Sequence, residues 1–157
     1  NTTIGTTILD GIRDNIGNQS SVSFSKNGDE PNDHDIIIAV VGETPYAEMK
    51  GDSESLELSN KDKLLLERLI KTGKPIVLIL ISGRPMIITP YLEHVDAVLA
   101  AWLPGTEGSG VADLLFGDVS PTAKLSFSWP RDMSQIPINY GDKTYDPLFP
   151  LGYGLTY

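Results

Sequence analysis

The sequence contains no cysteine, few basic residues and no apolar run long enough to cross a membrane. Without cysteine it has no disulfide, no thiol nucleophile and no cysteine-based metal site. Its 12 Lys and Arg against 21 Asp and Glu give a net charge of −9, which argues against the basic surface that nucleic-acid binding needs. The longest strongly apolar run, residues 75–81, is too short to span a bilayer, so we expect no membrane-spanning segment.

The size and composition fit a single globular domain. A chain of 157 residues with 40% hydrophobic residues can bury a real core, and its 15 Gly and 11 Pro predict many loops. The chain begins at Asn1 rather than at Met and goes directly into a threonine-rich helix start, without a signal-peptide pattern. We therefore expect it to be part of a longer protein.

The pattern of apolar residues predicts an α/β fold. Three runs predict strands that are covered on both faces: residues 36–41 and 75–81, which are apolar throughout, and residues 95–102, which are apolar apart from Asp96. Helices are predicted over residues 3–16, 61–71 and 111–117. Two alternating segments, 21–25 and 124–129, predict partly buried strands, and residues 83–95 predict a short strand and one helical turn. Buried strands that alternate with helices predict an open, mostly parallel sheet with helices on both faces.

The C-terminal tail, residues 130–157, is rich in Pro, Gly and Tyr, so we expect it to be irregular. We expect it to pack along a surface or against another domain. Its apolar side chains would form an adhesive patch if they were solvated. Leu148, Phe149, Leu151 and Tyr153 are therefore predicted to be packed.

The loop from Gly42 to Asn60 is long for a connection between a strand and a helix, and such length is typical of functional loops. In parallel sheets, ligands bind beyond the carboxyl ends of the strands. Three segments should meet at that rim: PYAEMKGD at 45–52, SGRP at 82–85 and WLPGTEGSG at 102–110.

The sequence predicts neither a cofactor nor a metal. The glycines of GTEGSG at 105–110 are spaced G-x-x-G-x-G, which does not match the dinucleotide fingerprint G-x-G-x-x-G. Asp52, Glu54 and Glu57 are close in sequence but lack the calcium-loop pattern, and no histidine lies near them. A solvated acidic loop explains these three carboxylates.

Glu43 and Glu48 follow the first buried run, inside the long loop. From the residues alone, two interpretations remain open. The glutamates are solvated loop groups, or one of them is a carboxyl group at the sheet rim that acts as general acid and base.

Five motifs in series carry a resemblance to a known family: GTTILDGI, VVGETPYAEMKGD, ISGRP, AAWLPGTEGSGVADLLFGD and YDPLFPLGYGLTY. Together they resemble the second, α/β-sandwich domain of family 3 glycoside hydrolases. They are most similar to the branch of β-glucosidases and exo-acting β-glucan glucohydrolases. The resemblance runs from about Thr2 to Tyr157, so residues 1–157 are predicted to form this C-terminal domain.

The resemblance implies a retaining hydrolase that removes glucose from the non-reducing ends of β-glucosides or β-glucan oligosaccharides. In the family, an aspartate nucleophile lies on a preceding (β/α)₈ barrel, and the acid/base glutamate lies in a PY-x-E-x-KGD segment. That role falls here on Glu48. Glu43 is then a supporting residue at most, and Arg84, Trp102 and Glu107 have structural or supporting roles. The resemblance also favours a secreted or periplasmic protein.

The sequence departs from the full family pattern because it lacks the barrel with its nucleophile. It also lacks the first strand of the sandwich and a tryptophan-bearing loop, both expected upstream of Asn1. An upstream barrel domain is therefore the partner that the resemblance implies. The alternative is a non-catalytic module of the same fold that binds carbohydrate or another protein.

Overall fold

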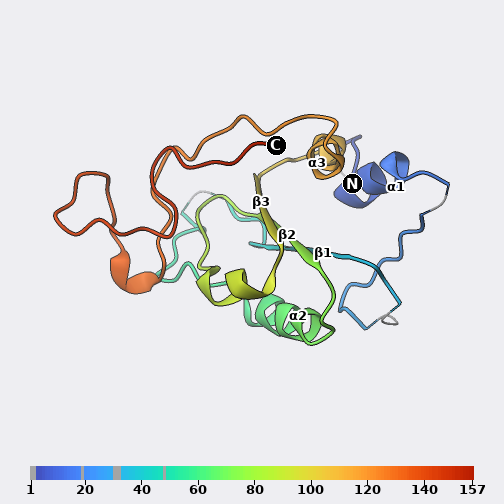
Figure 1. The fold of residues 1–157 in the computed structure, drawn as a ribbon. Coiled ribbons are helices and arrows are strands. Elements are labelled where there is room, and N and C mark those ends of the chain that lie inside the picture. Colours follow the sequence, from blue (N-terminus) through green and yellow to red (C-terminus); the bar gives the residue numbers. More distant parts are fainter. Residues whose placement is uncertain (1–2, 19, 30–32, 48) are drawn as a thin grey trace.

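A computed structural model describes residues 3–18, 20–29, 33–47 and 49–157. In this part of the chain a parallel sheet has three strands in the order β1-β2-β3 (Figure 1). The strands are β1 (Ile37–Gly42), β2 (Ile76–Ile81) and β3 (Ala97–Trp102). β2 pairs in parallel with both neighbours. The open parallel sheet predicted from the three apolar runs is confirmed.

Helices lie on both sides of the sheet, as predicted. Figure 1 shows α2 on one side and α1 packed with α3 on the other. The α-helices are α1 (Ile8–Asn15), α2 (Asn60–Ile70) and α3 (Gly108–Phe116), and the 3-10 helices are η1 (Thr89–His94) and η2 (Met133–Gln135). Among the described residues, no helix is both long and apolar enough to cross a membrane.

The main core lies between the sheet and α2. Leu78 and Leu80 of β2 and Leu66 of α2 have no exposed surface and belong to one cluster. Ile79 points to the opposite face of the sheet and is also fully buried. Covering each such side chain stabilises the fold by about 1.5–3 kcal/mol, so packing on both faces holds β2 in place.

β1 differs from the prediction that every apolar run is covered on both faces. Ala39 and Val41 are buried, but Val40 between them is 41% exposed. Successive side chains of a strand point to opposite faces, so one face of β1 is packed and the other is partly open. An apolar run alone does not reveal this difference, because it contains no polar residue on either face.

The first helix begins later than predicted. Thr7 caps α1: its hydroxyl oxygen accepts a hydrogen bond from the Asp10 amide at 3.1 Å. Thr6, directly before the cap, is extended and exchanges backbone hydrogen bonds with Thr106 and Gly108. A tertiary contact therefore keeps residues before Thr7 out of the helix.

Neither alternating segment forms a regular strand. No strand of the described residues pairs with residues 21–25, and Phe24 is 62% exposed. In segment 124–129, Trp129 forms a single antiparallel bridge with Phe149. Alternation predicts which side chains can be buried, but a strand also needs a partner for its backbone groups.

The tail after Pro130 is irregular apart from η2, as predicted. Leu148 and Phe149 pack against the main core, so the prediction of packed side chains is confirmed for them. The Tyr153 ring stacks on that of Phe149 with centroids 4.7 Å apart, but Tyr153 and Leu151 stay 37% and 43% exposed in this chain. The tail runs along the surface beside residues 125–129, so only part of its side chains reaches the core.

We expect the tail to be ordered in solution. The amides of Leu148 and Gly152 donate hydrogen bonds to the carbonyls of Trp129 and Leu125, both at 2.8 Å. Their hydrogen exchange should be at least about tenfold slower than that of residues 21–24, for which the described part of the chain supplies no backbone acceptor. Residue-resolved hydrogen exchange measures this ratio. Equal rates in the two segments would contradict the packing of the tail.

Candidate active site

The three segments predicted to meet at the sheet rim do so in the structure. Tyr46 comes from the loop after β1, Gly83 from the loop after β2 and Leu103 from the loop after β3. A Cβ placed on Gly83 would lie 2.8 Å from the Tyr46 hydroxyl oxygen and 4.0 Å from Leu103 Cδ1. The carboxyl ends of the strands thus form one small region, as expected for a parallel sheet.

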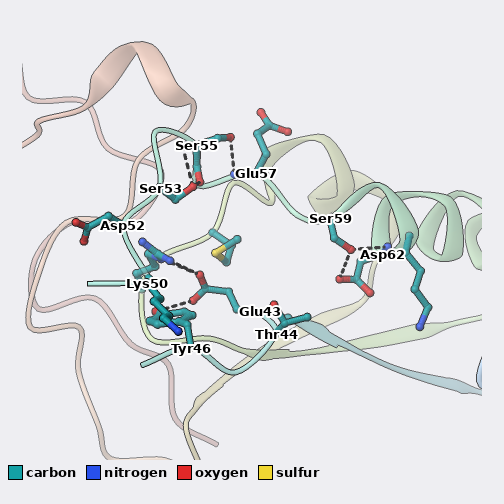
Figure 2. Close-up of a pocket in the computed structure, with 15 residues that line it drawn as sticks. Glu43, Thr44, Tyr46, Lys50, Asp52, Ser53, Ser55, Glu57, Ser59 and Asp62 are labelled. Atoms are coloured by element: carbon teal, nitrogen blue, oxygen red, sulfur yellow. Dashed lines mark hydrogen bonds and ion pairs between the residues drawn. The ribbon is translucent and has the colours of Figure 1, made fainter. Parts of the chain in front are cut away.

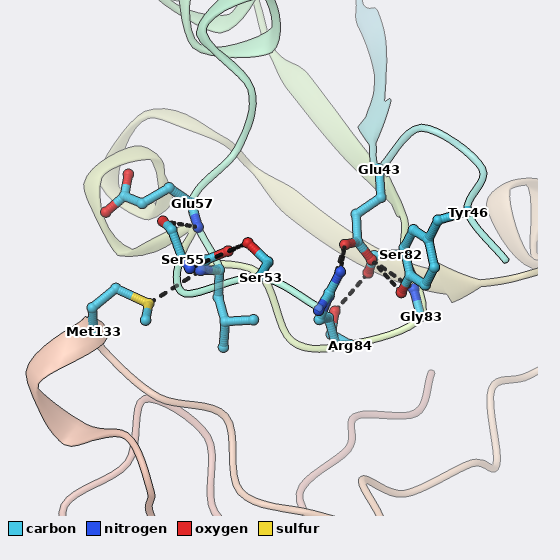
Figure 3. A network of polar contacts seen from close by, with 10 residues as sticks. Glu43, Tyr46, Ser53, Ser55, Glu57, Ser82, Gly83, Arg84 and Met133 are labelled. Carbon is cyan, nitrogen blue, oxygen red and sulfur yellow. Dashed lines mark hydrogen bonds and ion pairs between the residues drawn. The ribbon is translucent and has the colours of Figure 1, made fainter. Parts of the chain in front are cut away.

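Glu43 lies at the centre of the polar contacts at this rim (Figure 3). Its Oε1 accepts a hydrogen bond from Nε of Arg84 at 2.7 Å, and Nη2 of the same guanidinium lies 2.7 Å from Oε1 as an ion pair. Its Oε2 accepts from the Gly83 amide at 3.0 Å and from the Tyr46 hydroxyl at 3.3 Å. The side chain of Glu43 is only 13% exposed. A carboxylate with three hydrogen-bond donors and an arginine ion pair is well suited to hold loops together and poorly placed to donate a proton to a ligand.

Arg84 makes the strongest contact with Glu43. The hydrogen bond from its charged guanidinium to the carboxylate is charge-assisted and therefore stronger than one between neutral groups. The hydrogen bond to Glu43 raises the pKa of the Arg84 guanidinium, so the arginine stays charged. The Arg84 carbonyl accepts a hydrogen bond from the hydroxyl of Ser82, which is almost fully buried. Both the backbone and the side chain of Arg84 are therefore fixed.

Glu48, the predicted acid/base residue, lies outside the described residues, so its role stays a prediction. Its sequence neighbours are described. The Lys50 amide donates a hydrogen bond to the Ala47 carbonyl at 3.1 Å, which closes a turn, and Met49 has the left-handed φ of 64°. Ala47, Met49 and Lys50 are all exposed. The turn therefore projects from the rim into solvent in this chain.

An open hollow of about 410 Å³ lies beside this rim (Figure 2). One wall of the hollow is the segment 53–59, of which Ser53, Ser55, Glu57 and Ser59 line the hollow. The alternate residue Leu58 is buried in the core. Sequence reasoning missed these serines as lining residues, although the alternation of polar residues with leucine in SESLELS was the available signal.

The wall of the hollow is anchored by elements from other parts of the chain. The Leu56 amide donates to Met133 Sδ in η2 at 3.1 Å (Figure 3). The Leu56 carbonyl accepts from the Ile87 amide at 2.8 Å. At the far end, Ser59 caps α2 by accepting a hydrogen bond from the Asp62 amide. The long loop is thus held in place along much of its length.

The acidic residues of the loop do not form a metal site in the described structure. Glu57 pairs with Lys63 at 2.6 Å, and this hydrogen bond raises the pKa of the lysine. Within the described residues, no group of three or more His, Asp or Glu side chains is close enough to hold a metal ion.

Trp102 and Glu107 take part in contacts inside the protein. The Trp102 ring lies between Phe127 and Trp129, with ring centroids 5.3 and 5.7 Å away. Trp102 has φ of 51° at an irregularity between β2 and β3, and its carbonyl accepts from the Ser82 amide. Glu107 forms a backbone bridge with Thr6.

The domain has a parallel sheet with helices, and a hydrogen-bonded carboxylate and a polar hollow lie at the carboxyl ends of its strands. It belongs to the large class of α/β domains in which ligands bind at this rim of the sheet. Within that class, the chain belongs to the glycosyl hydrolase family 3 C-terminal domain family, whose model matches residues 1–157.

Comparison with individual proteins is consistent with this family. The chain is 36% identical over 146 residues to a periplasmic β-glucosidase of Salmonella typhimurium, a match that covers 78% of this chain and 19% of that protein. It is 35% identical to a β-xylosidase of Formosa agariphila, over 96% of this chain and 25% of that protein. The crystal structure of an exo-1,3/1,4-β-glucanase from a Pseudoalteromonas species matches with a TM-score of 0.88 and 41% identity, over 97% of this chain and 20% of that one. The chain thus spans a quarter or less of the length of these relatives.

Proposed function

We propose that this domain supplies the acid/base carboxyl group, Glu48, to a retaining β-glucosidase or exo-β-glucanase. The nucleophile comes from a barrel domain elsewhere in the full-length protein. The observation that carries the proposal concerns Glu43: three hydrogen bonds and an ion pair within the protein already hold its carboxylate. Of the two glutamates in this part of the loop, Glu48 is therefore the better candidate for proton transfer to a substrate.

Retaining hydrolysis requires two carboxyl groups about 5 Å apart. In the first step the nucleophile carboxylate bonds to the anomeric carbon, the glycosidic C–O bond breaks, and the proton of Glu48 goes to the leaving oxygen. In the second step water attacks the anomeric carbon, the bond to the nucleophile breaks, and a water proton returns to Glu48. One residue at the rim thus serves as acid and then as base.

The glucose preference is supported by the β-glucosidase and the exo-1,3/1,4-β-glucanase among the relatives. A β-xylosidase is the second candidate, because relatives with that name match at 35% and 40% identity. A xyloside differs from a glucoside by the missing hydroxymethyl group. Comparison of kcat/KM for aryl β-glucoside and aryl β-xyloside with the full-length protein decides between them.

The rival interpretation is a non-catalytic module of the same fold that binds carbohydrate or a protein partner. A longer reading frame that encodes an upstream barrel favours the enzyme, whereas an independent start codon near Asn1 favours the module.

The 157-residue polypeptide alone is expected not to hydrolyse an aryl β-glucoside, because the proposed nucleophile is not in it. The assay needs a folded fragment, shown by a cooperative thermal transition, and a Glu48→Ala fragment as the background control. Turnover by the wild-type fragment above that control would overturn the division of the active site between two domains.

A further inference from the structure

The loop after β1 is folded around the side chain of Tyr46. The Tyr46 hydroxyl donates to Glu43, and the Arg84 guanidinium carbon lies 4.9 Å from the centre of the ring. The backbone of Gly51 lies directly against the same ring, since a Cβ on Gly51 would be 2.2 Å from Tyr46 Cδ2. The two ends of segment 46–51 therefore meet at one aromatic ring.

The turn between these two ends has little other support among the described residues. The hydrogen bond from Lys50 to Ala47 holds the turn together but does not connect it to the sheet. Met49, at the turn, is 90% exposed. Among the described residues, the contacts of Tyr46 and Gly51 at its base are therefore those that connect the turn to the sheet.

Arg84 links this base to the sheet. It lies in the loop after β2, and its backbone is tied to the buried Ser82. Its guanidinium holds Glu43 with a hydrogen bond and an ion-pair contact and lies against Tyr46. We propose that Arg84 is a positioning residue for the reaction: through Glu43 and Tyr46 it sets the place of the turn that contains Glu48. This inference rests on the proposed function of Glu48.

The consequence for catalysis follows from the precision that proton transfer needs. A displacement of about 1 Å of a reacting group can lower the rate about 100-fold. A misplaced acid slows the departure of a poor leaving group, which must be protonated, more than that of an activated phenol, which needs little protonation. Loss of Arg84 should therefore change the dependence of the rate on the leaving group, whereas a general loss of folded protein would lower both rates equally.

The test uses the full-length enzyme with Arg84→Gln, and Arg68→Gln as the matched control. Arg68 also forms an ion pair, with Asp29, but it lies on α2 away from the rim. We expect Arg84→Gln to lower kcat/KM about 100-fold for an alkyl β-glucoside and less than about tenfold for 2,4-dinitrophenyl β-glucoside. Arg84→Lys should recover part of the loss, because it keeps the positive charge but not the contact of two guanidinium nitrogens with Glu43. Arg68→Gln should leave the ratio of the two rates unchanged.

A second variant should displace the same turn without a change of charge. Gly51→Ala places a methyl group where the Tyr46 ring lies, so it should shift the turn and alter the leaving-group ratio in the same direction as Arg84→Gln. Equal losses for both substrates in both variants, together with lowered thermal midpoints, would show a merely structural role. Unchanged rates for both substrates would also overturn the proposal.

Comparison of the Glu48→Ala and Arg84→Gln variants distinguishes a failure of this proposal from a failure of the proposed function. If Glu48→Ala shows the strong leaving-group dependence of a lost acid and Arg84→Gln does not, the positioning role fails and the assignment of Glu48 stands. If Glu48→Ala itself lacks that dependence, the acid lies elsewhere and both proposals fall.

Discussion

Glu48→Ala in the full-length enzyme is expected to slow the hydrolysis of an alkyl β-glucoside by about 100- to 10,000-fold, the usual contribution of a general acid. The first step loses its proton donor, so the leaving group must depart as an alkoxide. A dinitrophenyl glucoside needs little protonation, and its first step should be far less affected. For this substrate the glycosyl-enzyme should accumulate, because the second step has lost its base.

A small anion such as azide should restore turnover of the dinitrophenyl substrate by Glu48→Ala, because azide attacks the glycosyl-enzyme without a base. The product should be the β-glucosyl azide, identified by NMR, and the limb of the pH–rate profile that belongs to the acid should disappear. Glu43→Ala keeps the proposed acid/base carboxylate, so it should yield no glucosyl azide. Azide rescue by Glu43→Ala in place of Glu48→Ala would assign the acid/base role to Glu43.

Trp129→Ala is expected to have the largest effect on stability, about 3–5 kcal/mol in the free energy of unfolding. The side chain is 2% exposed, and its ring packs against those of Trp102 and Phe149. Its Nε1 donates a hydrogen bond to the Met86 carbonyl at 2.8 Å. The substitution thus opens a cavity and leaves a buried carbonyl without its partner.

Chemical denaturation of the 157-residue domain measures this loss, with Phe24→Ala as the control. Phe24 is 62% exposed, so its removal should change the stability by less than about 0.5 kcal/mol. Trp129→Phe should fall between the two, because it keeps an aromatic ring but loses the hydrogen bond, a cost of about 1–3 kcal/mol. An unfolding midpoint of Trp129→Ala equal to that of Phe24→Ala would contradict the place of this residue in the core.

The local sequence was enough to predict the sheet. Runs such as IVLILI contain only β-branched or leucine side chains, which can be buried as a strand but cannot be left in water, so β2 followed from its residues alone. The helix α2 was likewise predicted within one residue at each end, because the spacing of its leucines and the glycine after its last turn, Gly73, are local signals. The parallel arrangement then brought the loops after β1, β2 and β3 to one rim.

The tertiary structure alone decided what the rim residues do to one another. Glu43 and Arg84 are 41 residues apart, and no local pattern shows that a hydrogen bond and an ion pair join them or that Gly51 lies against the Tyr46 ring. The same holds for Thr6, which pairs with the loop before α3 and thereby delays the start of α1. Short-range patterns record which side chains can be buried along one element, whereas pairing between distant segments depends on how the packed elements place their ends in space.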